Sequence, residues 1–259
     1  MLDSLLEIAV GAGQKILKHY NSISEVFKKQ DNSPLTAADL DAHHYIFKAL
    51  EKAYPQIPIC SEEGIENGDP NTAERFWLVD PLDGTKEFIK RSGNFTVNIA
   101  LIENGNPTAG IIHVPTKNLS YVAARSQGAM KITSHGRRTE ISVSEAQNPP
   151  RFVASKDHAG PEVKQLIARY PGAECLSIGS SLKFCLVAEG SADVYLRDVP
   201  TMEWDTAAAH AILREAGGNI YCWPEMIPLM YGKSEYRNGA LITLADSGLL
   251  KELGNDRVG

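Results

Sequence analysis

A run of five strand-like segments in the middle of the chain constrains the fold most. The segments cover residues 76–79, 96–102, 108–114, 119–124 and 129–133. The second and third flank Glu103-Asn104-Gly105-Asn106-Pro107, a turn-forming sequence typical of a hairpin. Because short turns join antiparallel neighbours, we expect an antiparallel sheet as the framework of this part of the chain.

Two helices are expected before these strands. Apolar residues recur at helical spacing from Leu2 to Tyr20, which predicts a long amphipathic first helix. A second helix opens at Thr36 and runs to about Ala53, and Asp39 takes the third position of a capping box. The polar residues 28–34 between the helices predict a connecting loop, with a lid over a site as the alternative.

The sequence Asn148-Pro149-Pro150 is the clearest break in the chain. Beyond it, expected strands at 152–154, 175–178 and 194–197 alternate with helices near 161–169, from Ser180 and from Asp205. We therefore expect two halves: an α+β half with the antiparallel sheet (residues 1–148) and an α/β half (residues 149–259). Chemistry is expected in the groove between them.

Composition excludes several classes of protein. The 259 residues are 43% hydrophobic and 22% charged, as in ordinary globular proteins, and the net charge of −6 argues against a nucleic-acid partner. The N-terminus lacks the basic region of a signal peptide, and no apolar run approaches a membrane span. The four cysteines are expected to be reduced, buried thiols, and the protein is expected in the cytoplasm; loose attachment to the cytoplasmic membrane face stays open.

The most informative segment is Asp80-Pro81-Leu82-Asp83-Gly84-Thr85, which follows a buried strand. Its two carboxylates and the intervening carbonyl can meet at one point, and hard oxygen ligands of this kind suit magnesium. If a helix begins at Thr85, its free amides would also bind phosphate. An Asp-rich turn followed by a helix cap is the alternative interpretation of these residues.

Three further acids occupy comparable positions. Glu62 follows the apolar segment 57–60 at a second strand end, and Asp205 stands at the start of an Ala-rich helix. Helix capping is a sufficient role for Asp205 and for Asp39 on spacing alone.

The segment 80–85, together with Trp204-Asp205 and Ser61-Glu62-Glu63, resembles the signature of the inositol monophosphatase superfamily of lithium-sensitive phosphatases. Residues 31–39, 77–100, 179–189 and 204–210 resemble its 3′(2′),5′-bisphosphate nucleotidase branch, which serves sulfur assimilation. The resemblance implies a layered α-β-α-β-α sandwich of the sugar phosphatase type, with the active site between the two halves.

The resemblance also implies roles for individual residues. It places one magnesium ion on Glu62, Asp80 and the Leu82 carbonyl, and a second on Asp80, Asp83 and Asp205, with a weaker third ion at Glu62 left open. It makes Asp39 and Thr85 the pair that orients the attacking water, with Glu62 as a further catalytic residue.

Substrate contacts are implied in two groups. The first surrounds the scissile phosphate and comprises Glu62, Leu82, Asp83, Gly84, Thr85 and Asp205. The second would contact the rest of a nucleotide and comprises His158, Ser180, Lys183 and Arg197. From the residues alone, Gly179-Ser180-Ser181 opens a helix that offers a second anion site, and Lys183 and Arg197 would be ordinary solvated charges.

The expected activity is hydrolysis of adenosine 3′,5′-bisphosphate to AMP and phosphate. The alternatives are an inositol monophosphatase or fructose-1,6-bisphosphatase with the same metal site, and a catalytically silent homologue that binds nucleotide. A small molecule is the expected partner, either this bisphosphate or its sulfated relative, with no nucleic acid and no stable protein partner. Oligomeric state stays open.

Overall fold

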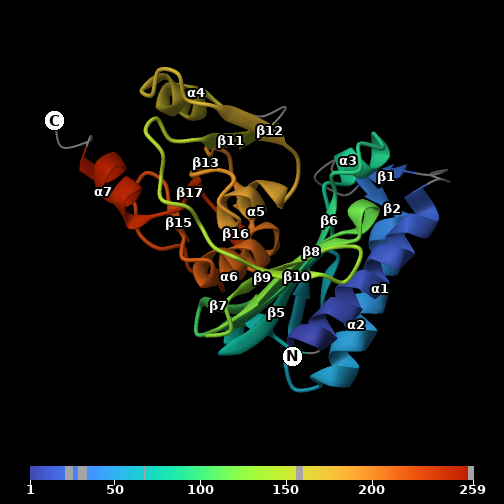
Figure 1. The fold of residues 1–259 in the computed structure, drawn as a ribbon. Helices are drawn as coiled ribbons and strands as arrows, with labels where there is room; N and C mark the ends of the chain where they lie inside the picture. The colour runs from blue at the N-terminus through green and yellow to red at the C-terminus, as the bar shows by residue number, and fades with distance from the viewer. Residues whose placement is uncertain (21–25, 29–33, 67, 156–159, 256–259) are drawn as a thin grey trace.

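The computed structural model describes the chain from residue 1 to 255, apart from residues 21–25, 29–33, 67 and 156–159. Helices of the first half cover one face of a large sheet (Figure 1). The elements of this half are α1 (Leu2–Tyr20), β1 (Val26–Lys28), β2 (Pro34–Thr36), α2 (Ala37–Ala53), β3 (Ile59–Ser61), β4 (Gly64–Glu66), η1 (Pro70–Thr72), β5 (Arg75–Asp83), α3 (Thr85–Ile89), β6 (Thr96–Glu103), β7 (Asn106–Val114), η2 (Pro115–Lys117), β8 (Leu119–Ala124), β9 (Ala129–Ile132) and β10 (Arg138–Ile141).

The elements of the second half are β11 (Phe152–Ser155), α4 (Pro161–Ala168), β12 (Cys175–Ile178), α5 (Leu182–Ala188), β13 (Val194–Arg197), β14 (Thr201–Met202), η3 (Glu203–Asp205), α6 (Ala207–Glu215), β15 (Asn219–Cys222), β16 (Arg237–Asn238), β17 (Leu241–Leu244) and α7 (Ser247–Asn255). In this half, strands and helices alternate as far as β13; β14 and η3 then precede α6, and three strands precede α7.

Two main sheets organise the fold. The larger has eight strands in the order β10-β9-β8-β7-β6-β5-β3-β4, and all of its pairs are antiparallel except β3 with β5. The smaller has five strands in the order β12-β11-β13-β17-β15, with parallel pairs at the β12 side and antiparallel pairs at the β15 side. The predicted antiparallel framework is thus confirmed, and the second sheet is mixed.

Side chains alternate between the faces of the strands, which divides the interior into successive layers. On β5, Trp77 and Val79 face the cluster beneath α1 and α2, whereas Phe76 and Leu78 face the cluster around α5 and α6. On β13, Tyr195 faces that same central cluster, while its neighbours join a third cluster with α4 and α7. The order is helices, large sheet, helices, small sheet, helices, as the resemblance implied (Figure 1).

Several expectations differ from the structure in detail. Lys28 and Pro34 belong to the antiparallel strands β1 and β2, so the predicted loop 28–34 is shorter, and its central residues 29–33 lie outside the described residues. The helices expected from Ser180 and Asp205 begin later, at Leu182 and Ala207, because a turn with Ser180 at φ 53° and the 3₁₀ turn η3 precede them.

The cysteines are all free thiols, but only Cys60 and Cys185 are buried. Cys175 is exposed on the edge strand β12, and Cys222 is half-buried, so the expectation of four buried thiols was wrong for these two. Among the described residues, no helix combines the length and apolar character needed to cross a bilayer.

Candidate active site

A cleft of about 660 Å³ lies between the end of β5 on one side and the residues around α5, β13 and η3 on the other. It collects residues that are more than 100 positions apart in the chain. The predicted residues that line it are Glu62, Asp80, Leu82, Asp83, Gly84, Thr85, Ser180, Lys183, Arg197 and Asp205.

The end of β5 is irregular, and this irregularity brings Asp80 and Asp83 to the same cleft. Asp80 pairs with Asn98 of β6 and Asp83 pairs with Thr96, so β5 carries one more residue than β6 between these pairs. In a regular strand, residues three apart would face opposite sides, and the extra residue returns Asp83 to the side of Asp80. The Leu82 amide donates to Oδ1 of Asp80 (3.0 Å), which holds the turn.

Glu62 reaches the cleft because β3 runs parallel to β5. Ser61 is in register with Val79, and the Glu62 amide donates to the Val79 carbonyl (3.0 Å), directly before Asp80. Both side chains line the cleft, and the charge of Glu62 acts to raise the pKa of Asp80. The strand end predicted from the sequence therefore delivers a carboxylate beside Asp80.

Asp83 and Asp205 are each held by protein donors. Oδ2 of Asp83 accepts from both the amide and the hydroxyl of Ser181 (2.6 Å each) and from Thr96 (3.3 Å). Oδ2 of Asp205 accepts from the Met202 amide (3.0 Å) and from the Thr201 hydroxyl. In the described part of the chain, Oδ1 of both carboxylates accepts no hydrogen bond.

Burial and the charges of neighbouring acids raise the pKa of two of these carboxylates, Asp80 and Asp205. Burial is the first cause that raises the pKa of Asp80 well above its usual range, and the charges of Glu62, Asp83 and Asp205 act in the same direction. Burial, followed by the charge of Asp83, raises the pKa of Asp205 to about 6, although the bonds from Thr201 and Met202 oppose this shift.

The donor set fits a divalent cation. It consists of hard carboxylate oxygens with the Leu82 carbonyl beside them, which is the chemistry that magnesium prefers. Within the described residues, however, no three of these acids are arranged closely enough to hold a metal ion by themselves. A cation would offset the repulsion that raises the pKa of Asp80, and the oxygens outside the protein hydrogen bonds of Asp83 and Asp205 are suitable ligands.

The two carboxylate oxygens of Asp39 make different contacts. Its Oδ2 accepts from the Thr36 amide (2.8 Å) and hydroxyl (2.6 Å), which completes the capping box of α2. Its Oδ1 accepts from the Thr85 hydroxyl at 3.2 Å, and this hydroxyl also lies 3.3 Å from the Leu82 carbonyl. The capping role expected from spacing and the contact implied by the resemblance are therefore both present.

The opposite wall of the cleft carries two basic side chains. Lys183 is buried rather than solvated; its Nζ donates to the Ser180 carbonyl (2.7 Å) and lies 5.4 Å from the centre of the Tyr195 ring. Burial is the main cause that lowers the pKa of Lys183 to about 8. Arg197 is half-buried, and its guanidinium donates to the carbonyls of Val199 and Pro200 at 3.2 Å.

The helix start after Ser180 and His158 were both expected to contribute to substrate binding. Leu182 opens a helix of only seven residues, and the amide of Ser181 before it already donates to Asp83, so the anion site expected at this helix start lacks that donor. His158 lies outside the described residues. Sequence reasoning placed Ser181 in an anion site rather than beside Asp83. It missed Thr96 and Thr201, because a threonine carries no signal until the fold places it beside a carboxylate.

Residues 1–254 match the family model described as the inositol monophosphatase family. The chain belongs to this family. Its members are metal-dependent phosphatases, generally with magnesium, and the acidic cleft of this chain agrees with that property.

The chain is also similar to several individual CysQ proteins. The chain is 46% identical over 226 residues to the 3′(2′),5′-bisphosphate nucleotidase CysQ of Escherichia coli K12, covering 86% of this chain and 91% of that protein. It is 37% identical to the CysQ of Aggregatibacter actinomycetemcomitans over 91% of this chain and 88% of that protein. The crystal structure of CysQ from Bacteroides thetaiotaomicron superposes with a TM-score of 0.81 at 41% identity, over 94% and 97% of the two chains.

Proposed function

We propose that this chain is a magnesium-dependent 3′(2′),5′-bisphosphate nucleotidase that hydrolyses adenosine 3′,5′-bisphosphate to AMP and phosphate. The observation that carries the proposal is a single cleft that brings four acids, Glu62, Asp80, Asp83 and Asp205, together with the buried Lys183 and with Arg197. Such a cleft offers separate places for a scissile phosphate and for a second anionic group. The identity to several CysQ proteins supports the same substrate class.

Glu62, Asp80, Asp83, Asp205 and the Leu82 carbonyl would hold magnesium, in two sites with a weaker third left open. Bound magnesium supplies activation of water and neutralisation of the phosphate charge. Hydrolysis transfers the phosphoryl group to water, breaks the bond to the sugar oxygen and leaves that oxygen protonated. Without help this reaction is among the slowest in biology, which explains the concentration of charge in the cleft.

The Thr85 hydroxyl would orient the attacking water. Asp39 accepts the Thr85 proton at 3.2 Å, which leaves the lone pairs of that hydroxyl oxygen available to a water molecule in the cleft. Gly84, in the left-handed region with φ 91°, turns the chain there, and the backbone amides that follow it can contact the scissile phosphate. Glu62 completes this catalytic group from the neighbouring strand end.

The remaining nucleotide contacts are proposed for Ser180, Lys183 and Arg197. The Ser180 hydroxyl is buried and has no hydrogen-bond partner in the described structure, and Ser180 lines the cleft. Lys183 and Arg197 supply positive charge close to it, and Arg–phosphate pairs are among the stronger hydrogen-bonded contacts. We assign His158 to the same group on the family resemblance.

A substrate panel tests the proposal. The purified protein is supplied with magnesium and assayed for phosphate release from adenosine 3′,5′-bisphosphate, its 5′-sulfated relative, inositol 1-phosphate and fructose 1,6-bisphosphate. We expect the highest kcat/KM for one of the two nucleotides. A higher value for the inositol phosphate or the sugar bisphosphate would overturn the assignment, and no magnesium-dependent release from any of them would indicate a silent homologue.

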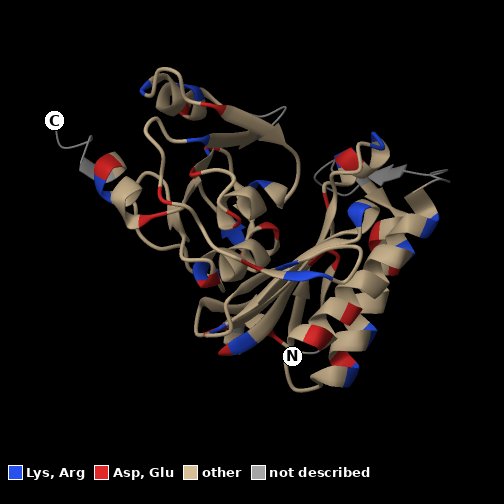
Figure 2. Cartoon of the chain, in the orientation of Figure 1, with Lys and Arg blue, Asp and Glu red and all other residues tan. Residues whose placement is uncertain are grey.

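The charge distribution agrees with a small-molecule substrate. Basic and acidic segments are interspersed along α1 and α2 (Figure 2). The net charge of −6 also disfavours a nucleic-acid backbone as the partner.

A further inference from the structure

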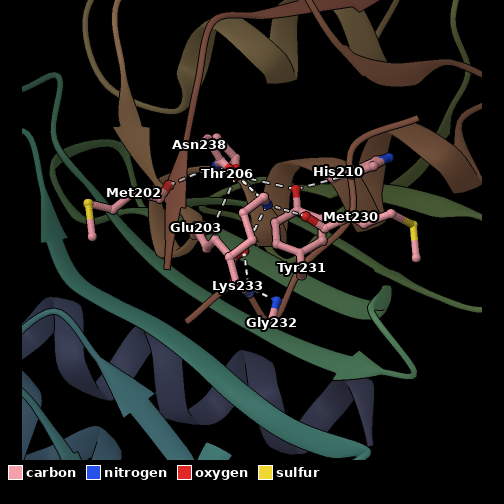
Figure 3. Close-up of polar contacts among 9 residues, drawn as sticks. All are labelled: Met202, Glu203, Thr206, His210, Met230, Tyr231, Gly232, Lys233 and Asn238. Atoms are coloured by element: carbon pink, nitrogen blue, oxygen red, sulfur yellow. Dashed lines mark hydrogen bonds and ion pairs between the residues drawn. The ribbon is translucent and has the colours of Figure 1, made fainter. Parts of the chain in front are cut away.

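A polar cluster behind the cleft joins two segments that are distant in sequence (Figure 3). One segment is residues 201–206, which carries Asp205, and the other is residues 229–238, which follows β15. The clustered residues in the figure are Met202, Glu203, Thr206, His210, Met230, Tyr231, Gly232, Lys233 and Asn238. Of these, only Thr206 lines the cleft, so the proposed reaction assigns the others no part.

Glu203 is the centre of this cluster. Its side chain is fully buried, and its carboxylate accepts from the amides of Gly232 (2.8 Å) and Lys233 (3.1 Å) and from Lys233 Nζ (2.9 Å). Lys233 Nζ also donates to Asn238 Oδ1 (3.0 Å) and to the Met230 carbonyl. A buried carboxylate is tolerated only when it is paired and hydrogen-bonded, and Lys233 supplies the pairing charge.

Residues 229–238 also hold residues 201–206 through backbone hydrogen bonds. Thr201 and Met202 pair with Asn238 and Arg237 as the two-stranded sheet β14–β16, and the Glu203 amide donates to the Tyr236 carbonyl at 2.7 Å.

Thr206 is held by side chains of the same cluster. Its hydroxyl accepts from Asn238 Nδ2 (3.0 Å) and Tyr231 (3.3 Å), and His210 Nδ1 lies 3.1 Å from the Tyr231 hydroxyl.

These contacts surround Asp205 without touching its carboxylate. Asp205 Oδ2 accepts from two protein donors, the Thr201 hydroxyl and the Met202 amide. Both donors belong to β14, the strand that pairs with β16. The orientation of the Asp205 carboxylate therefore depends on how firmly residues 201–206 are held. Groups that orient a metal ligand from behind commonly control metal affinity although they do not bind the metal.

We propose that Glu203 and Lys233 are positioning residues that hold residues 201–206 so that the Asp205 carboxylate is set for a divalent cation. The inference rests on the proposed metal site. It also assigns a role to residues 229–238, none of which lines the cleft.

Lys233→Met provides the test, because it keeps the length of the side chain and removes the charge that pairs with Glu203. Calorimetry with magnesium alone, without substrate, should show about tenfold weaker binding than in the unaltered protein. The magnesium concentration for half-maximal phosphate release should rise by a similar factor, while kcat at saturating magnesium is largely retained. Lys233→Arg keeps the charge and should restore magnesium binding.

A matched control separates positioning from a general loss of stability. Asp193 is also fully buried and pairs with Arg151 at 2.7 Å, and neither residue lines the cleft. Asp193→Asn should lower the melting temperature and leave magnesium binding unchanged. Glu203→Gln is a second variant with the expected behaviour of Lys233→Met; if it does not fold, the half-exposed Lys233 still decides the question.

Unchanged magnesium binding in folded Lys233→Met would overturn the inference, as would an equal loss in Asp193→Asn. No magnesium binding by the unaltered protein would refute the metal site itself, and the inference with it. Magnesium binding without hydrolysis of the bisphosphate would refute only the proposed substrate, because the calorimetric comparison does not use it.

Discussion

The Thr85 hydroxyl donates to Oδ1 of Asp39 at 3.2 Å, across 46 positions of the chain, while Oδ2 of the same carboxylate caps helix α2. The Asp39 side chain therefore both caps a helix and accepts a hydrogen bond from the Thr85 hydroxyl, which lines the cleft. The two roles use different oxygens, so they can be separated by substitution.

Asp39→Asn tests this separation. The amide oxygen can still cap α2, so we expect a stability loss of about 1 kcal/mol or less. The charge that accepts the Thr85 proton is lost, and kcat should fall by about 100-fold or more. Thr36→Ala is the control, because it weakens the cap and should lower the melting temperature with little effect on kcat. Normal turnover in Asp39→Asn would contradict the catalytic role.

Asp83→Asn and Asp205→Asn test the metal assignment. Each removes one charged ligand while retaining an oxygen for the donors that hold Oδ2. Magnesium should raise the melting temperature of the unaltered protein, since a ligand that binds only the folded state stabilises it. This rise should largely disappear in both variants, together with hydrolysis. Activity within several-fold of the unaltered protein at modest magnesium would refute the assignment.

Arg197→Ala tests substrate identity rather than the shared phosphatase chemistry. A charge-assisted contact to the second phosphate contributes about 1.5–3 kcal/mol, so kcat/KM for adenosine 3′,5′-bisphosphate should fall by roughly one to two orders of magnitude. Hydrolysis of a small monophosphate that does not reach Arg197 should hardly change. The exposed Arg169 at the end of α4 does not line the cleft, and Arg169→Ala is the matched control. An equal fall on both substrates would assign Arg197 to the fold or the metals.

The buried Lys183 predicts a pH dependence. Burial lowers its pKa to about 8, so in the free protein the ammonium loses its charge as the pH rises through about 8 rather than through 10.5. Because kcat/KM reports the free enzyme, its value for the bisphosphate should decline above about pH 8. Lys183→Arg keeps the charge at high pH and should move this decline upward. The same decline in Lys183→Arg would show that another group titrates.

Lithium tests the behaviour that the family resemblance implies. A monovalent ion at a magnesium position cannot supply the same charge to the departing oxygen, so initial rates should fall across a lithium series at fixed magnesium. An equal series of sodium chloride controls for ionic strength. A flat response to lithium would argue against that resemblance and would leave the magnesium requirement untouched.

Local patterns in the sequence were sufficient for the elements that carry Asp39 and Asp80. The apolar run before Asp80, the capping box at Thr36 and the hairpin turn at 103–107 each depend on residues close in the chain, and each is found in the structure. Short strands such as β4, β14 and β16 were not predicted, because two or three residues show no usable alternation.

What only the tertiary structure decided is which side chains meet. Lys183 looks like a surface charge in sequence and is buried because α5 packs between the two sheets. Ser181 becomes a partner of Asp83, and Lys233 a partner of Glu203, only when segments 98 and 30 residues apart are brought together. Propensity and spacing act over a few residues, whereas these contacts arise from the packing of distant layers, and that packing shapes the site.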